Sequence, residues 1–156
     1  MSFNRPVHST STCISSFPKI FGSTGTTNLY HIDVFNDYLA LAGYTAASTL
    51  TGTTSIIPYL ALTSISTGDK YYWVKALTLK QNNYFNGVKF STDGALLIAH
   101  SRDPSSNYIV VFNVSSGNIL SARSYSAGGR SNYSYRIRSM TVSSGASPMA
   151  YVLSNY

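Results

Sequence analysis

The stretch that decides the fold runs from residue 88 to residue 121 and reads VKFSTDGALLIAHSRDPSSNYIVVFNVSSGNILS. Its opening triplet, Val88-Lys-Phe90, alternates apolar and polar positions, as a strand with one buried face does. A turn that ends in Gly94 leads into a second apolar run, and a later turn around Gly117 precedes the last strand. Glycine supplies the positive φ that tight hairpins need. The stretch therefore predicts four antiparallel strands joined in chain order.

The same pattern occurs three times along the chain. The triplet recurs at residues 32–34 (IDV) and 140–142 (MTV), and each copy is followed by a turn and an apolar run. The first copy also has the second half of the unit, with an apolar run at 59–65 and a further strand from residue 71. The last copy contains only the first two strands. Tandem repetition of a four-stranded unit at this spacing indicates a repeat architecture.

Residues 88–121 resemble one blade of the WD40/YVTN-like β-propeller superfamily. In that superfamily an innermost strand, V-x-F-S-x-D-G, leads to an apolar strand and an Asp-containing loop. A strand of the form I-x-V-F/W follows, and the blade ends with x-T/S-G-x-x-L. All these elements are present in order. The chain departs from WD40 proteins proper, because it has no Gly-His dipeptide and Phe112-Asn113 stands at the Trp-Asp position. The resemblance is therefore to the broad propeller superfamily.

The resemblance implies an all-β fold of tandem four-stranded antiparallel meanders. It places β-propeller blades at residues 28–80 and 83–127 and a partial blade at 132–156. Residues 1–27, rich in Ser and Thr, are expected to form an irregular arm. Two complete blades and a partial one do not close a ring that needs about four to eight. We therefore expect that assembly completes the ring, that the ring continues in a longer chain, or that the units stack as an open array. The alternative fold is a β-sandwich of about ten strands.

Composition also favours strands. The chain has no glutamate and one glutamine, whereas aromatic and β-branched residues are abundant. Charged residues make up 10% of the sequence, against about 25% in average proteins, and the net charge is +6. Low charge with many Ser, Thr, Tyr and Asn residues is common in extracellular and cell-surface assemblies, and we expect that location. No apolar run has the length of a membrane span, and the first 20 residues lack the apolar region of a signal peptide.

The sequence contains no motif for catalysis, metal binding or cofactor binding. His8, His31 and His100 are the only histidines, and none has a metal-ligand spacing. A Ser–His–Asp set built on His100 and Asp103 carries little weight, because serines are abundant and no Gly-x-Ser-x-Gly elbow is present. A calcium site in the loop 101–107 is disfavoured, because that loop has a single carboxylate. We therefore expect no enzymatic activity, no metal and no cofactor.

Aromatic and arginine side chains are the better candidates for partner binding. Tyr71, Tyr72 and Trp73 lie on the expected fourth, outer strand of the first unit, so Tyr71 and Trp73 share one face and Tyr72 takes the other. Exposed Tyr, Trp and Arg are enriched in interfaces, and stacked aromatics also hold sugars. Asn113 and Asn132 begin N-glycosylation sequons. The candidate partner- or glycan-binding residues are Tyr71, Trp73, Tyr133, Tyr135, Arg136 and Arg138.

The leading hypothesis from the sequence is a non-enzymatic structural or binding scaffold in a surface or extracellular assembly. Such a scaffold associates with itself or with other proteins through strand edges and loops. The alternatives are a fragment of a propeller enzyme and a glycan-binding propeller lectin. Nucleic acid is a disfavoured partner, because the arginines from Arg123 to Arg138 are spread rather than clustered. Cys13 is the only cysteine, so no disulfide forms within the chain.

Overall fold

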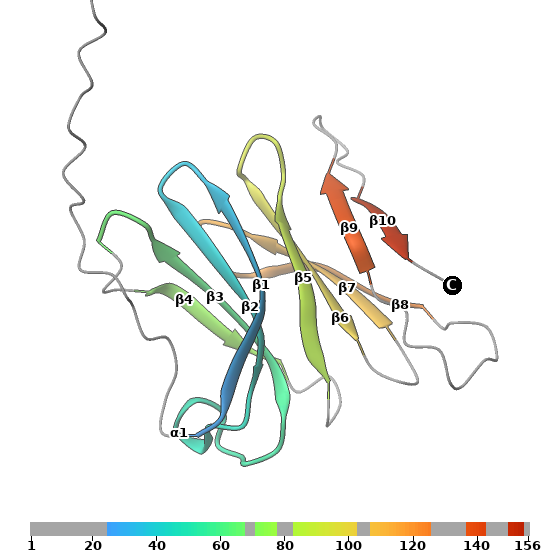
Figure 1. Ribbon diagram of the computed structural model, residues 1–156. Coiled ribbons are helices and arrows are strands. Elements are labelled where there is room, and N and C mark those ends of the chain that lie inside the picture. The colour runs from blue at the N-terminus through green and yellow to red at the C-terminus, as the bar shows by residue number, and fades with distance from the viewer. Residues whose placement is uncertain are drawn as a thin grey trace, which may run out of the picture.

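The computed structural model describes residues 25–67, 71–77, 83–102, 107–125, 137–142 and 150–154. This part of the chain is all-β apart from the four-residue helix α1 (Ser48–Thr51). Two four-stranded antiparallel sheets and a two-stranded sheet follow each other along the chain (Figure 1). The expected all-β fold of tandem four-stranded meanders is therefore confirmed.

The two large sheets have the same topology. The first has the strand order β1-β2-β3-β4 and the second the order β5-β6-β7-β8, so each strand pairs with the next one in sequence. The third sheet pairs β9 with β10. Every strand expected from the repeats is present among them. The strands are β1 (Thr27–Phe35), β2 (Tyr38–Thr45), β3 (Ile57–Ser64), β4 (Tyr71–Ala76), β5 (Tyr84–Phe90), β6 (Leu96–Arg102), β7 (Asn107–Asn113), β8 (Ile119–Tyr125), β9 (Ile137–Val142) and β10 (Ala150–Ser154).

The two large sheets also share irregularities at matching positions. The β1–β2 register shifts between Leu29 and His31, and the β5–β6 register shifts between Phe85 and Gly87. These positions coincide when Ile32 is aligned with Val88, as the sequence repeat requires. The β3–β4 and β7–β8 pairs are likewise shifted at aligned positions. A β-bulge is a specific local structure, so its repetition indicates that both sheets are copies of one unit.

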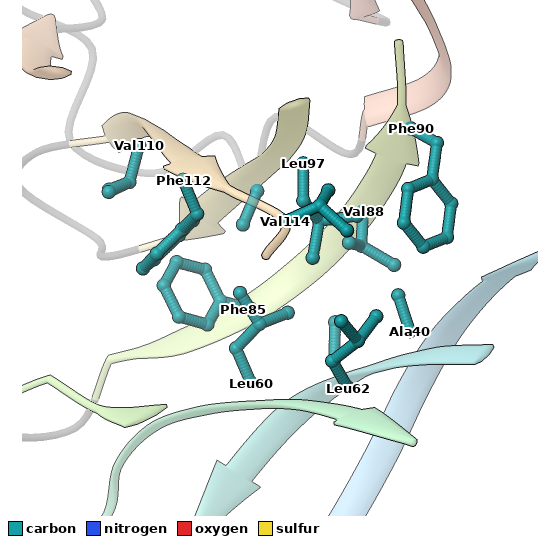
Figure 2. Packing of buried hydrophobic residues seen from close by; sticks show 12 residues of the cluster. Ala40, Leu60, Leu62, Phe85, Val88, Phe90, Leu97, Val110, Phe112 and Val114 are labelled. Atoms are coloured by element: carbon teal, nitrogen blue, oxygen red, sulfur yellow. The ribbon is translucent and has the colours of Figure 1, made fainter. Parts of the chain in front are cut away.

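The two large sheets pack face to face and bury one shared core. Small side chains on β2, Ala40 and Ala42, leave room for the phenylalanine rings of the second sheet. Phe85 and Phe112 are fully buried there and meet edge to face, with ring centroids 6.4 Å apart. Figure 2 shows how the two sets of side chains face one another. The core contains Ala40, Ala42, Leu60, Leu62, Phe85, Val88, Phe90, Leu97, Ala99, Val110, Phe112 and Val114.

The first strands of the three sheets lie side by side in chain order. β1 contacts β5, and β5 contacts β9 (Figure 1). None of these strands pairs with another, because each belongs to a different sheet. The sheets are therefore stacked in chain order along this row of first strands.

Side chains of β1 provide acceptors for the unpaired edge of β5. The carboxylate of Asp33 accepts a hydrogen bond from the backbone N–H of Phe90 at 2.8 Å and lies 2.5 Å from the ammonium of Lys89. Nδ1 of His31 accepts a weaker hydrogen bond from the N–H of Val88 at 3.4 Å. Unpaired backbone N–H groups are costly once water is excluded. The first sheet therefore contributes polar partners to the second as well as apolar contact.

Replacing Asp33 tests which of its two bonds matters. Asp33→Ala removes the acceptor of the Phe90 N–H and is expected to lower the free energy of unfolding by about 1.5–3 kcal/mol. Lys89→Ala removes only the ion pair, whose lysine is partly exposed, and is expected to cost about 1 kcal/mol or less. Urea denaturation of the two variants measures both values. An equal loss in the two would contradict the importance of the backbone hydrogen bond.

Two glycines with the same backbone conformation test the packing between the sheets. Gly52 (φ 72°) and Gly94 (φ 70°) both adopt the left-handed region, but a Cβ on Gly52 would meet no atom within 4 Å. A Cβ on Gly94 would lie 2.0 Å from the Phe35 ring of β1. Gly52→Ala is expected to cost about 1–2 kcal/mol from backbone strain, and Gly94→Ala about 1–3 kcal/mol more. Equal thermal stabilities of the two variants would show that the contact with Phe35 does not hold the sheets together.

Candidate partner-binding surface

A β-bulge separates the two aromatic residues that the sequence placed together. Leu62 pairs with Trp73, but the next pair is Thr63 with Tyr71, because the register shifts between them. Trp73 therefore faces the shared core, where Leu62 lies, and Tyr71 faces the opposite side of the sheet. The expectation that Tyr71 and Trp73 share one face is wrong. The inserted residue, Tyr72, changes the alternation.

Trp73 joins the first sheet to the second. Its indole Nε1 donates a hydrogen bond to the carbonyl oxygen of Val114 at 2.7 Å. Its ring stacks on Phe112, with centroids 6.0 Å apart and an interplanar angle of 22°. Gly117 lies directly under the same ring, where a Cβ would approach it to 2.8 Å. The aromatic surface of Trp73 is thus engaged between the sheets.

Tyr71 lies at the edge of the first sheet and is 40% exposed. Its side chain is hydrogen-bonded to Tyr59, a fully buried residue of β3. Burial raises the pKa of Tyr59 first, and the contact with Tyr71 raises it further. Tyr72 packs edge to face on Tyr38, with centroids 5.2 Å apart. The tyrosines of this edge are therefore in contact with the sheet, and Tyr71 keeps part of its ring in solvent.

For most of the other candidate residues, the structure describes no position relative to Tyr71 and Trp73. Tyr133, Tyr135, Arg136 and Asn132 lie outside the described residues. Arg138 belongs to β9. Cys13 and most of the loop 101–107 also lie outside the described residues.

Asn113, the first sequon asparagine, caps the turn between β7 and β8. Its Oδ1 accepts hydrogen bonds from the hydroxyl of Ser115 at 2.7 Å and from the backbone N–H of Ser116 at 3.0 Å. The hydroxyl of Ser116 lies 3.1 Å from the same oxygen. The carboxamide therefore has a structural role in this turn.

Two aspartates stabilise hairpin turns. The carboxylate of Asp37 accepts hydrogen bonds from the hydroxyl of Ser64 at 2.5 Å and from the N–H of Ser66 at 2.8 Å, and these lower its pKa. The pKa of Asp93 is lowered first by the hydroxyl of Ser91, at 2.5 Å, and then by the backbone N–H of Ala95. Asp93 bonds within its own turn, as Asp side chains commonly do, whereas Asp37 of the β1–β2 turn holds the neighbouring turn that follows β3.

His100 is a buried histidine of β6. Its Nδ1 lies 2.6 Å from Oδ1 of Asn86, so this nitrogen carries the proton in the neutral ring. Burial disfavours the charged form and lowers the pKa of His100 to about 4. The ring is therefore neutral at physiological pH and holds β5 to β6.

Among the described residues, no three His, Cys, Asp or Glu side chains are close enough to bind a metal ion together. In the same part of the chain, no helix has the length and apolarity needed to cross a bilayer.

The most unusual exposed surface lies on β1. Ile32 and Val34 are 58% and 52% exposed. They pair with Leu41 and Leu39 of β2, so they lie on the face of the first sheet that points away from the second sheet. The middle of this face, at Tyr59 and Ala61, is buried. We call the exposed part, Ile32 and Val34 with the half-buried Leu39, the β1 strip.

Comparison with known proteins gives no relative from which to transfer a function. No protein-family model, curated protein or solved structure matches the chain.

Sequence reasoning missed the β1 strip. The pattern of residues 32–34 predicts a half-buried strand, but the aligned triplets have the same pattern whether or not a neighbouring sheet covers them. The local pattern therefore offers no signal that could have found it.

The pKa of His100 makes stability depend on pH in a defined window. The unfolded ring binds a proton near pH 6.5 and the folded ring only near pH 4, so the unfolded state gains stability as the pH falls between these values. The free energy of unfolding is expected to drop by up to about 1.4 kcal/mol per pH unit there. Stability added by the lowered pKa values of Asp37 and Asp93 is lost mainly below this window.

His100→Gln removes this titration, and urea denaturation between pH 4 and 8 measures its effect. The variant is expected to be less stable at pH 7.5 but to show a much shallower decline between pH 6.5 and 4. The same slope in both proteins would assign the pH dependence to other groups.

Proposed function

We propose that this chain is a non-enzymatic structural or binding scaffold whose sheets are blades of a propeller-like stack of the WD40/YVTN kind. Three observations support the propeller-like arrangement: the repeated meander order, the bulges at aligned positions, and the row formed by β1, β5 and β9. Scaffolds of this kind bind partners through loops, edges and uncovered faces. Its low charge supports a place in an extracellular or cell-surface assembly.

One observation carries the proposal of partner binding. Ile32 and Val34 are aligned with Val88 and Phe90, which are 0% and 5% exposed. Val88 and Phe90 are buried because the first sheet packs on them. The corresponding face of the first sheet carries the same kind of apolar side chain, but there Ile32 and Val34 are exposed. An exposed apolar strip on a sheet built for stacking is typical of an interaction surface.

Sugar binding was suggested by a shared aromatic platform, but Tyr71 and Trp73 lie on opposite faces of the first sheet.

Affinity capture from an extract of the native source tests the proposal with two matched variants. Ile32→Glu/Val34→Glu places charges on the β1 strip, and Ile119→Glu/Leu120→Glu places them on similarly exposed positions of β8. We expect proteins that are retained by the wild type and by the β8 variant to be reduced at least about tenfold on the β1 variant. Quantitative mass spectrometry measures retention, with self-retention counted through untagged copies.

Fluorescence of Trp73, the single tryptophan, checks that all three proteins are folded. Identical retention by the three would contradict partner binding through the β1 strip.

A further inference from the structure

We propose that Tyr30 of β1 and Tyr84 of β5 form a site of oxidative coupling, at which a peroxidase joins the two rings and links the first sheet covalently to the second. The proposal uses residues outside the β1 strip and does not depend on partner binding. Its test is therefore separate from the test of the proposed function.

Three tyrosine rings meet where the first sheet contacts the second. Tyr30 is in ring contact with Tyr44 of β2 and with Tyr84 of β5, with centroids 5.8 Å and 5.1 Å away. The contact with Tyr84 is the closer of the two, and it crosses from one sheet to the other. β1 and β5 lie side by side along this junction (Figure 1). A bond between these two rings would therefore link the sheets.

A β-bulge brings Tyr30 to this position. The register shift between Leu29 and His31 leaves Tyr30 without a paired residue on β2. The aligned residue of the second sheet is Asn86, which bonds His100 of its own sheet. Tyr30 instead reaches across to β5. A bulge changes the direction of a side chain, and here it directs a tyrosine toward the neighbouring sheet.

The hydroxyl groups of the three rings are also close to one another. Partial burial raises the pKa of Tyr30 most, and the neighbouring hydroxyls of Tyr44 and Tyr84 raise it further, Tyr44 also through a hydrogen bond. The carboxamide of Asn28 donates a second hydrogen bond to the hydroxyl of Tyr44. Phenols couple at the ring carbons beside the oxygen. The arrangement of the hydroxyls therefore brings the reactive carbons of neighbouring rings together.

The site is accessible to an oxidant in solution. Tyr30 is 53% exposed, and Tyr84 is half-buried beside it. Cys13 is the only cysteine of the chain, so a disulfide cannot join the two sheets. Coupling of tyrosines is a covalent route that needs no cysteine, and the exposed ring of Tyr30 is where it begins.

The coupling is a two-electron oxidation, for which a haem peroxidase with hydrogen peroxide supplies the oxidant. Each phenol gives one electron to the peroxidase and loses its hydroxyl proton. The two phenoxyl radicals join through ring carbons ortho to the oxygens, and the hydrogen on each of these carbons moves to the oxygen as the ring regains its aromaticity. The protein loses two hydrogen atoms in total, and one hydrogen peroxide becomes two water molecules.

Treatment of the dilute full chain with a haem peroxidase and limiting hydrogen peroxide tests the site. Trypsin cleaves after Lys and Arg, so it places Tyr30 in fragment 20–70 and Tyr84 in fragment 81–89. The expected product is a monomer that has lost two hydrogen atoms and whose digest contains these two fragments joined through Tyr30 and Tyr84. Peptide fragmentation in the mass spectrometer identifies the joined residues.

Phenylalanine variants supply the controls, because they keep the rings and remove only the hydroxyls. Tyr84→Phe and Tyr30→Phe are each expected to lose the joined fragments. Tyr72→Phe removes a tyrosine that is 54% exposed elsewhere on the first sheet, and it is expected to keep them. Circular dichroism shows whether each variant is folded before treatment.

The link is also expected to stabilise the fold. It closes a loop from residue 30 to residue 84 and so restricts the unfolded chain. The Tm of the isolated coupled monomer is expected to be about 10 °C higher than that of the untreated protein. Tyr84→Phe, treated in the same way, controls for other oxidation and is expected to show no rise.

Four outcomes would overturn the inference. Coupling within fragment 20–70 alone would show that Tyr30 joins Tyr44 of its own sheet. Coupled dimers without coupled monomers would show that the reacting rings belong to different copies. A coupled monomer with an unchanged Tm would show that the rings leave their folded positions to react, and no coupled product would show that the site is unreactive. None of these outcomes bears on capture through the β1 strip.

Discussion

One constraint governs this structure: the first four-stranded sheet is apolar on both faces. β3 shows this directly, because all eight of its residues are buried. Leu60 and Leu62 face the second sheet, whereas Tyr59 and Ala61 face the opposite side. A sheet of this kind is unfavourable in water when only one face is covered, because apolar surface costs about 25 cal/mol for each Å² left exposed. The sheets therefore stack, and their short connections make them stack in chain order.

Apolar packing is not directional, so polar contacts are needed to fix how one sheet sits on the next. Two such contacts tie the first sheet to the second. The carboxylate of Asp33 holds the edge of β5 through the N–H of Phe90, and the indole of Trp73 reaches the carbonyl of Val114 near the other edge of the stack. Because a hydrogen bond fixes both distance and angle, the two contacts limit sliding and rotation between the sheets. Because Gly94 has no Cβ, the Phe35 ring packs directly against the turn of the β5–β6 hairpin.

The sequence was sufficient to predict the meanders, because the period-2 triplets and the glycine turns are local signals. Residues 88–121 identified four strands in order, and the structure has them as β5 to β8. The faces of the outer strands were not predictable in the same way. The inserted residue Tyr72 reverses the alternation of side chains along β4. Tyr71 and Trp73 therefore lie on opposite faces of the sheet, although their spacing predicts one face. The acceptor role of Asp33 depends on a strand 56 residues away, and no local pattern reveals it. The exposure of the β1 strip was not predictable either, because its residues have the same apolar–polar–apolar pattern as the buried triplet 88–90.

The positions of the bulges bear on how such a chain meets a partner. Every described pairing that involves an edge strand contains a register shift, whereas the central pairs β2–β3 and β6–β7 contain none. A bulge interrupts the row of unpaired backbone groups along an edge and so opposes continuous strand addition. A bulged edge is therefore a poorer template for strand addition than a regular one. The faces have no such protection on β1, where Ile32 and Val34 are exposed beside a polar edge formed by His31 and Asp33. A partner that covers this face buries apolar side chains without breaking the edges, which is how the second sheet already packs on the first.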